Sequence, residues 1–319
     1  MRRSGYGWDK RHEAFSAGPA TSAAVTIVVD APLRPPPARH LVVVGMGLVG
    51  GSLCRALRAA YPALRLSGVD RSGIIELARE QRIIDDGVAA DDDVAVHALL
   101  DEADAVILAL PVLAVIATME RHRGVLTGTL VIDTGSTKAA VVDAARALGL
   151  RCFVGGHPMA GRSSGGLAWA DARLFDGARW FLCADTEVEP QALARARALV
   201  TAVGADPVEV DAADHDRDVA LTSHLPHLLA NVLAEAVLSA SATDAAGGSL
   251  RDILKVAGAP IEVWGDTIST NRVAIGTALD DVIARLTTLR RDLDSPQLDT
   301  ERLKELFAHG RALRERLHG

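Results

Sequence analysis

The residues best suited to chemistry are one histidine and a group of glycines about a hundred residues before it. His157 lies in the stretch 155–161, among glycines and a proline, and an imidazole can accept a proton near neutral pH. Gly45, Gly47 and Gly50 have the spacing Gly-x-Gly-x-x-Gly, which binds dinucleotide phosphates when it joins a strand to a helix. A dinucleotide would carry a hydride while the histidine takes a proton. Together these groups predict oxidation of an alcohol-like carbon.

The segments on either side make the glycine spacing more specific. Residues 41–44 are apolar and mostly β-branched, as in a strand buried on both faces, and residues 52–60 have helical composition. Gly45 would permit the tight turn, Gly47 the close approach of backbone to pyrophosphate, and Gly50 close packing of helix on strand. The helix N-terminus would then face the phosphates. We therefore predict a dinucleotide-binding fold.

An acidic residue after the second predicted strand indicates which dinucleotide binds. This strand, residues 66–70, ends at Asp70, 20 residues after Gly50. Its carboxylate can bind both ribose hydroxyls and would repel a 2′-phosphate, which favours NAD, whereas Arg71 keeps NADP as the alternative. The predicted cofactor contacts are Gly45, Gly47, Leu48, Val49, Gly50, Asp70, Arg71, Leu110, Pro111 and Thr134.

Composition and charge favour a soluble enzyme. A chain of 319 residues with 49% hydrophobic residues can form two domains with a large core. Its net charge of −7 argues against a nucleic-acid partner, which would need a basic surface. The longest uncharged run, 105–119, is too short for a membrane span. Three cysteines without metal-ligand spacing, and an N-terminus without an apolar signal segment, predict a cytoplasmic protein with no metal site.

Alternation of strand-like and helix-like segments defines the fold class. It predicts an α/β protein whose N-terminal part is a Rossmann-type, doubly wound parallel sheet, followed by an all-α dimerisation domain. A helix is predicted at 190–203, between the last two strands. After the first two strands, the further strands are predicted at 105–110, 130–133, 152–154 (leading into a loop that holds His157), 180–183 and 207–210.

Changes in residue character divide the chain into three predicted parts. Residues 1–38 form a flexible extension that ends in a proline run, residues 39–211 the dinucleotide-binding domain, and residues 212–319 the helical domain. Within the helical domain, residues 214–241 are predicted as one long helix that is kinked by Pro226.

An apolar stripe in the helical domain predicts a homodimer. Leu279, Leu286 and Leu293 belong to a set of apolar residues that recur at helical spacing, and a charged amphipathic helix follows at 301–317. The predicted sheet already needs its own helices on both faces. Burial of the stripe against a twofold-related copy would keep it out of water.

Three histidines lie close together on the predicted kinked helix: His215, His224 and His227. His224 and His227 are three residues apart and share a helix face. A zinc site needs more ligands, and no cysteine or glutamate completes the set. A structural alternative is that the histidines cap a bent helix. The functional interpretation is that this face closes over the cofactor and binds an anionic substrate.

From about residue 40 to residue 275 the chain resembles the prephenate and arogenate dehydrogenases of tyrosine biosynthesis. The order and spacing of several short motifs carry this resemblance. They are Gly50-Gly51-Ser52, the strand 105–110 with Pro111, the string 133–138, the glycine-rich string 156–161, residues 174–177, the histidine string 215–227, Arg251-Asp252, and Trp264.

The resemblance implies oxidative decarboxylation of a cyclohexadiene. Hydride leaves ring C4 for the nicotinamide, the ring carboxylate leaves as carbon dioxide, and the ring becomes aromatic. In this family the catalytic residues matching His157 and Ser136 contact the C4 hydroxyl, the histidine assists its deprotonation, and the residue matching His227 faces the pyruvyl side chain. The implied substrate is a small dicarboxylate and the implied assembly a homodimer. The implied substrate-binding residues are His227, Lys255, His224 and Arg251.

Two departures from the family pattern leave the substrate open. Lys255 stands where the family usually carries an arginine, so the planar fork for a carboxylate is lost. Residues 162–164, Arg-Ser-Ser, stand where an acidic residue is often found. Prephenate, arogenate and the 4-amino-4-deoxyprephenate of antibiotic pathways are therefore all candidates. A β-hydroxyacid dehydrogenase or a non-enzymatic dinucleotide sensor would explain the fold but not the histidine strings.

Overall fold

The computed structural model describes residues 38–162 and 164–318. The predicted N-terminal extension, residues 1–38, lies outside the described residues except for Ala38, which is buried. Within the described ranges, no helix combines the length and the apolar character needed to cross a membrane.

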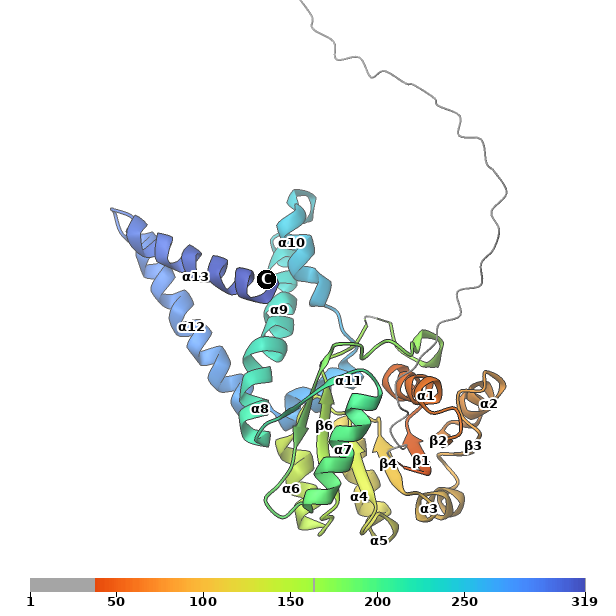
Figure 1. Cartoon of the computed structure of the whole chain (residues 1–319). Coiled ribbons are helices and arrows are strands. Elements are labelled where there is room, and N and C mark those ends of the chain that lie inside the picture. The colour runs from red at the N-terminus through yellow and green to blue at the C-terminus, as the bar shows by residue number, and fades with distance from the viewer. Residues whose placement is uncertain (1–37, 163, 319) are drawn as a thin grey trace, which may run out of the picture. The chain divides into compact units, whose positions relative to one another are not determined.

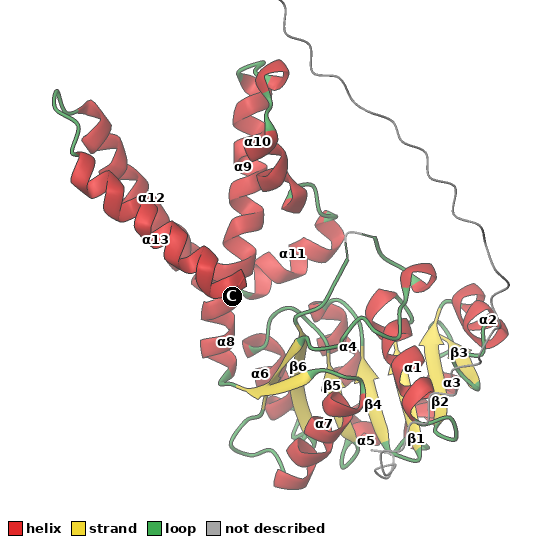
Figure 2. Cartoon of the chain, turned by 45° about the horizontal axis from the view of Figure 1, so that its top comes forward, coloured by secondary structure: helices red, strands yellow, loops and turns green. Residues whose placement is uncertain are grey.

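The described part of the chain is built around an eight-stranded sheet with the strand order β3-β2-β1-β4-β5-β6-β7-β8 (Figure 2). Neighbouring strands are parallel except β6 and β7, which are antiparallel. The chain order reverses between β1 and β4, where the carboxyl ends of the strands open a crevice for ligands. The predicted doubly wound, mostly parallel sheet is confirmed. The strands are β1 (His40–Val44), β2 (Arg65–Asp70), β3 (Asp86–Ala89), β4 (Ala105–Leu108), β5 (Leu130–Asp133), β6 (Phe153–Pro158), β7 (Arg179–Cys183) and β8 (Asp206–Glu209).

Helices cover both faces of this sheet, as the alternation along β1 requires. Leu41 and Val43 pack into one core cluster, whereas Val42 and Val44 pack into the other. The first cluster receives α1 (Leu48–Ala60), α2 (Ser72–Glu80) and α7 (Pro190–Ala202). The second receives α3 (Asp93–Asp101), α4 (Val112–Arg121), α5 (Arg123–Leu126) and α6 (Ala139–Ala147).

The chain is helical after β8, which confirms the predicted all-α part (Figure 1). A short 3₁₀ turn, Leu254–Val256, follows α10 and packs on α9. Helix α11 packs on α4, one of the helices that cover the sheet. A small core of Ala220, Leu225, Ile275 and Ala278 joins the start of α9 to α12. The helices are α8 (Ala212–Val219), α9 (Leu225–Ser239), α10 (Gly248–Ile253), α11 (Ile261–Thr270), α12 (Arg272–Asp294) and α13 (Thr300–His318).

The helix predicted over 214–241 differs from the structure in how it bends. A π-helical turn, Ala220–His224, separates α8 from α9, and Pro226 occupies the first turn of α9. Proline has no N–H to donate and its ring crowds the preceding turn, so the helix widens just before it. This wider turn contains His224.

The position of His157 also differs from the prediction. We expected a loop after Val154, but β6 continues through His157 to Pro158 and pairs with β7. The glycines before His157 serve close packing instead of a turn. A Cβ at Gly156 would lie 2.4 Å from the carbonyl oxygen of Asp133 on the neighbouring strand. The histidine is therefore held by a sheet register.

Candidate active site

The glycine turn after β1 is shaped by two close backbone approaches. Gly45 has a φ of 96°, and a Cβ there would lie 2.2 Å from the carbonyl oxygen of Ala109 after β4. A Cβ at Gly50 would lie 1.9 Å from the carbonyl oxygen of Gly45. Both positions therefore require glycine for the reasons given by the dinucleotide-binding pattern.

The start of α1 has the free groups that a pyrophosphate needs. The first hydrogen bond within α1 runs from Gly51 N to Gly47 O at 3.0 Å, so the N–H groups of Leu48, Val49 and Gly50 have no acceptor within the helix. A Cβ at Gly47 would meet no atom within 4 Å. Open space beside Gly47 and outward N–H groups fit a bound phosphate.

Asp70, at the end of β2, is tied to the glycine turn itself. Its Oδ2 accepts a hydrogen bond from Met46 N at 2.7 Å, and its Oδ1 accepts one from Arg71 N at 2.7 Å. Each oxygen keeps a further lone pair for a ribose hydroxyl. The Arg71 side chain is largely exposed.

A cleft runs from this carboxylate along the ends of β1 and β4. Gly45, Asp70, Arg71 and Leu110 line it, together with residues of α4. Pro111 is the N-cap residue of α4. Thr134, half-buried after β5, donates its N–H to Leu108 O at 3.1 Å and so joins the ends of β4 and β5. The structure thus brings the predicted cofactor residues to one edge of the sheet.

A buried ion pair fixes the ends of β5 and β6. Lys138 Nζ pairs with Asp133 Oδ2, and both side chains are fully buried. Asp133 also accepts hydrogen bonds from Gly135 N at 2.8 Å and from Gly156 N at 2.9 Å. Ser136 lies half-buried within this short connection between β5 and α6. The backbone on both sides of Ser136 and just before His157 is thereby held in place.

A series of hydrogen-bonded side chains connects α8 to His157. Asp216 Oδ1 accepts from His215 Nδ1 at 2.8 Å, and His215 Nε2 lies 2.9 Å from His157 Nδ1. The same carboxylate caps α6 by accepting from the backbone N–H groups of Lys138 and Ala139 at 2.7 and 2.9 Å.

This series of hydrogen bonds sets the proton positions on the imidazoles of His215 and His157. A carboxylate accepts only, so His215 carries a proton on Nδ1, and in the tautomer with this single proton its Nε2 is an acceptor. With this tautomer of His215, His157 donates from Nδ1. Its Nε2 is left with a lone pair and no proton, which is the state a general base requires.

His224 is fixed with the opposite polarity. The side-chain Nδ2 of Asn271 donates to Asp216 O at 2.7 Å and lies 3.2 Å from His224 Nδ1. His224 Nδ1 is then an acceptor, which places the proton on its Nε2. Within the described residues that buried Nε2 has no hydrogen-bond partner. The cluster therefore contains an acceptor at His157 and a donor at His224.

His227 completes the cluster against an aromatic wall. Its ring lies 4.1 Å from the ring of Trp264, measured between centroids, and His224 meets the same indole edge-on at 5.9 Å. The His227 Nδ1 is buried without a hydrogen-bond partner among the described residues. Two unused polar atoms beside an indole form a surface that could bind both polar and ring groups of a substrate.

Three histidines of this cluster, His157, His224 and His227, have lowered pKa values that favour the neutral form. Burial, with added repulsion from His215, Lys138 and His224, holds the pKa of His157 well below its ordinary value. Burial also lowers the pKa of His224 to about 4 and lowers that of His227. A neutral His157 is available as a proton acceptor throughout the physiological range.

Two contacts attach the helical part to the strand ends. Asp266 Oδ2 on α11 accepts from Leu113 N in the first turn of α4 at 3.1 Å. Thr270 Oγ1 lies 2.8 Å from Thr137 Oγ1, next to Ser136. The histidines of α8, the π-helical turn and α9 are thus held at the carboxyl edge of the sheet, the edge at which the cofactor cleft also lies.

Comparisons with known proteins decide the family. A family model described as prephenate dehydrogenase, nucleotide-binding domain, matches residues 53–209, and one described as prephenate dehydrogenase, dimerization domain, matches residues 211–309. The chain is 32% identical to the prephenate dehydrogenase of Bacillus subtilis over 287 residues, which cover 87% of this chain and 76% of the relative. It belongs to the prephenate dehydrogenase family.

Other members of this family differ in the substrate that their names give. The cyclohexadienyl dehydrogenase of Zymomonas mobilis is 30% identical over 82% of this chain and 90% of its own length. The crystal structure of arogenate dehydrogenase from Synechocystis superposes with a TM-score of 0.75 at 28% identity, covering 87% of this chain and 99% of the other. The predicted family, fold class and enzyme class are confirmed, whereas family membership alone leaves the substrate open.

Two predicted substrate-binding residues lie apart from the histidines. Lys255, in the turn after α10, is exposed and pairs with the equally exposed Asp252 at 2.8 Å. Arg251 is exposed on α10. The backbone of Val256 bonds to His227, so the turn that contains Lys255 adjoins the cluster although the ammonium group points to solvent.

Sequence reasoning did not assign roles to three residues of this prephenate dehydrogenase site: Asp216, Asn271 and Lys138. Asp216 and Asn271 act through side chains buried against distant segments, and Lys138 acts through a buried side chain that pairs with Asp133, five residues before it. The string 133–138 contained one signal that could have predicted the ion pair. Lys138 follows an apolar strand that ends in Asp133, and a lysine near such a strand is costly to bury unless it pairs with the aspartate.

Proposed function

We propose that this chain catalyses NAD-dependent oxidative decarboxylation of prephenate, giving a 4-hydroxyphenylpyruvate. The observation that carries the proposal is the hydrogen-bonded series Asp216–His215–His157, which, in the tautomers assigned above, leaves a lone pair on His157 Nε2. Bound NAD would take the hydride from ring C4. The ring carboxylate leaves as carbon dioxide, and aromatisation makes the step effectively irreversible.

His157 is the proposed general base for the C4 hydroxyl. Its neutral state and single free nitrogen suit removal of that proton as hydride leaves, a contribution typically worth about 10²–10⁴-fold. The His215–Asp216 chain keeps the ring in the required tautomer and orientation. Ser136, on the connection held by the buried Lys138–Asp133 pair, is proposed to share the contact with the same hydroxyl.

The remaining polar groups are proposed to hold the two carboxylates. His224 offers a donor at Nε2, and His227 a second polar atom beside Trp264, both suited to the pyruvyl end. Lys255 and Arg251 remain proposals for anion binding. Lys255 would first have to exchange Asp252 for the substrate carboxylate, and the exposure of this ion pair makes the exchange inexpensive.

NAD is proposed to lie along Gly45, Gly47, Gly50 and the first turn of α1, with its adenosine ribose on Asp70. Leu110, Pro111 and Thr134 would border the nicotinamide half. Asp70→Ser should relax discrimination against NADP, because the ribose hydrogen bond and the repulsion of a 2′-phosphate disappear together. Comparison of kcat/KM for the two cofactors tests this, and a wild type that already prefers NADP would contradict it.

Mixing the protein with NAD and prephenate and following the absorbance of reduced cofactor tests the activity itself. We expect turnover with NAD and release of carbon dioxide in equal amounts. Reduction of NAD without carbon dioxide would indicate a simple hydroxyacid dehydrogenase. Absence of both, in a protein that binds NAD, would indicate a dinucleotide sensor and contradict the proposal.

A second candidate substrate is 4-amino-4-deoxyprephenate. Lys255 in place of the usual arginine, already paired with Asp252, alters the anion-binding end of the site. An amine at C4 can also donate to His157 Nε2. Running the amino compound, prephenate and arogenate side by side will rank them by kcat/KM, and the highest value identifies the substrate.

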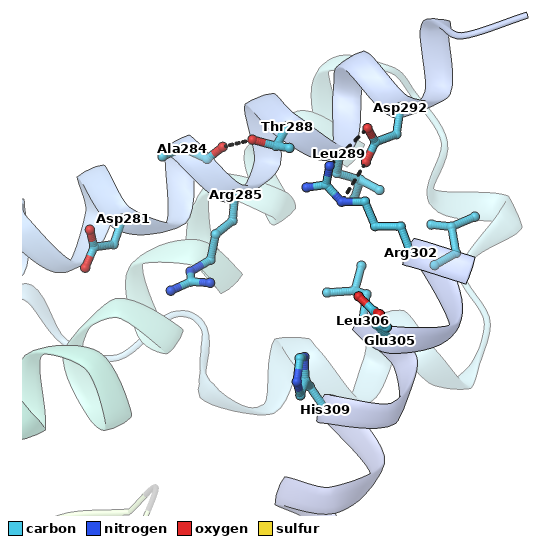
Figure 3. Close-up of a pocket in the computed structure, with 11 residues that line it drawn as sticks. Asp281, Ala284, Arg285, Thr288, Leu289, Asp292, Arg302, Glu305, Leu306 and His309 are labelled. Atoms are coloured by element: carbon cyan, nitrogen blue, oxygen red, sulfur yellow. Dashed lines mark hydrogen bonds and ion pairs between the residues drawn. The ribbon is translucent and has the colours of Figure 1, made fainter. Parts of the chain in front are cut away.

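We also propose a homodimer formed by the helical part, which begins near residue 212, and a cytoplasmic location. The match to a dimerization domain supports the pairing. Ile283, Leu286 and Leu293 on α12 are exposed, and Phe307 on α13 is 72% exposed. Figure 3 shows the hollow between these helices, where Arg302 pairs with Asp292 while Leu289 and Leu306 line its wall. These apolar groups would be covered by a second copy.

Light scattering tests the assembly. The expected mass is twice that of the 33.5 kDa chain. Leu286→Asp should shift the protein to monomer, whereas Thr287→Asp, a neighbouring exposed position without an apolar side chain, should disturb it less. A wild type that is monomeric and fully active would contradict the proposed dimer.

A further inference from the structure

A second cleft lies on the outer surface of the sheet half, apart from the glycine turn and the histidines. Its volume is about 520 Å³, within the range of small-molecule sites. Three segments meet there: α1, the turn that follows α2, and the connection between β6 and β7. Its polar and aromatic lining consists of Arg55, Arg58, Gln81, Arg82, Arg162, Trp169 and Asp171.

Among the described residues, two of the four guanidinium groups have an acidic partner and two have none. Arg58 pairs with Asp85 at 2.7 Å, and Arg162 pairs with Asp171 at 2.6 Å. Arg55 donates to the neutral Gln81 at 2.6 Å, and its buried Nε has no hydrogen-bond partner within residues 38–162 and 164–318. A protein of net charge −7 thus keeps uncompensated positive charge in this cleft.

Arg82 adds the second uncompensated charge at a backbone position that does not favour arginine. It follows the C-terminus of α2 with a φ of 55°, and Ile83 N donates back to Ala78 O at 2.9 Å. Glycine is the usual residue at such a helix end because a Cβ is unfavourable there. The Arg82 side chain has no ion pair in the described part of the chain. A ligand-binding role would account for an arginine at this position.

The opposite wall of the cleft carries an exposed aromatic side chain next to the Arg162–Asp171 ion pair. Trp169, in the short 3₁₀ turn Leu167–Trp169, is 52% exposed and is followed by Ala170 in the lining. An indole face beside free guanidinium groups suits a planar ring that carries an anion. Guanidinium forks match carboxylates bidentately. We propose that this cleft binds a small aromatic carboxylate.

The residues of this cleft contact α1, the helix whose N-terminus is proposed to bind the cofactor phosphates. Leu167 and Ala170 pack against Gly51 in α1, where a Cβ would lie 2.6 and 3.0 Å from their side-chain atoms. Asp171 N donates to Ser52 Oγ at 2.9 Å. A ligand held by Trp169 would thus contact the connection between β6 and β7. This connection follows the strand that contains His157 and packs against the first turns of α1. This inference goes beyond the proposed reaction and does not depend on it.

Binding of 3-phenylpropanoate to the full chain, followed by calorimetry without NAD or substrate, tests the proposal. Arg82→Gly is the main variant, because glycine fits the backbone there and the fold should be preserved. Arg82→Gly and Trp169→Ala should each weaken binding at this site by about tenfold or more, the usual effect of losing a charged hydrogen bond or an aromatic contact. Arg79→Ala, an exposed arginine of α2 that does not line the cleft, is the matched control and should bind as the wild type does.

Three outcomes would overturn the assignment. Equal affinity in all four proteins would place the probe elsewhere, for instance at the histidine cluster. No binding to the wild type would leave the cleft without the proposed ligand. Tighter binding of adenosine monophosphate, with the same dependence on Arg82 and Trp169, would identify a nucleotide site instead of a carboxylate site. Melting temperature and basal turnover, measured on the same samples, will show that each variant is folded.

Discussion

The glycine turn and the histidine cluster lie at the same edge of the sheet but are built in opposite ways. The turn works through missing side chains, because Gly45 and Gly50 let backbone approach backbone. The cluster works through buried side chains, in which Asp216 and Asn271 set the polarity of His157 and His224. In the first region the local sequence determines the geometry. In the second, hydrogen bonds between distant segments determine the protonation pattern.

The largest expected effect is a loss of kcat on substitution of His157, the proposed general base. His157→Asn should lower kcat by at least about 10²-fold, because an amide cannot accept the hydroxyl proton. NAD affinity should be nearly unchanged, since the glycine turn is untouched. Steady-state kinetics together with NAD titration will measure both. Activity within threefold of wild type would show that His157 is not the base.

A smaller loss of kcat is expected at His215, the residue that precedes His157 in the same series of hydrogen bonds. His215→Phe removes the acceptor for His157 Nδ1 and leaves the His157 tautomer unspecified, so kcat should fall by about tenfold or more. His215→Gln places a carbonyl near the lost Nε2 and should recover much of the activity. If the two variants lose equal activity while retaining wild-type melting temperatures, the tautomer argument fails.

Substitutions in the glycine turn should separate folding from binding. Gly50→Ala forces a Cβ against Gly45 O and should destabilise the fold by roughly 1–3 kcal/mol, as overpacking does. Gly47→Ala meets open space and should leave the melting temperature unchanged while weakening NAD binding. Thermal unfolding and NAD titration of both variants provide the comparison. Equal melting temperatures would contradict the packing role of Gly50.

The pH dependence should be the smallest effect. The pKa of His157 is lowered well below 6.5, so the base is already unprotonated at neutral pH. Log kcat should therefore be flat from about pH 6.5 to 8 and should fall only as acid protonates His157 below that range. A pH–rate profile measures this. An acid limb centred at or above 6.5 would contradict the depressed pKa.

Much of the fold could be predicted because the relevant signals are local. The glycine spacing, the apolar strands and Pro226 each act within a few residues of chain. Strand β3 was missed because it is only four residues long and half-buried throughout. The glycines at 155 and 156 predict a loop from the sequence, whereas in the structure they permit close packing inside a sheet.

The site was less predictable, for a physical reason. His157 and His215 are 58 residues apart, and His224 and Asn271 are 47 apart, so no sequence window contains either pair. The resemblance supplied which histidines to consider, and their roles remain predictions. Which nitrogen of each ring is free follows only from the positions of the carboxylate and the amide. Lys255 illustrates the reverse case, since its charge is evident in the sequence but its exposed partner Asp252 is not.

The antiparallel pairing of β6 with β7 has a consequence for inactivating substitutions. His157 faces its side of the sheet because it pairs with Phe181, and a slip of one residue would turn the imidazole to the opposite face. Phe181 also packs edge-on against His215. A screen for lost function will therefore find positions along β7 that never touch a ligand. Their defect would be one of alignment, with the protein still folded and every catalytic group still present.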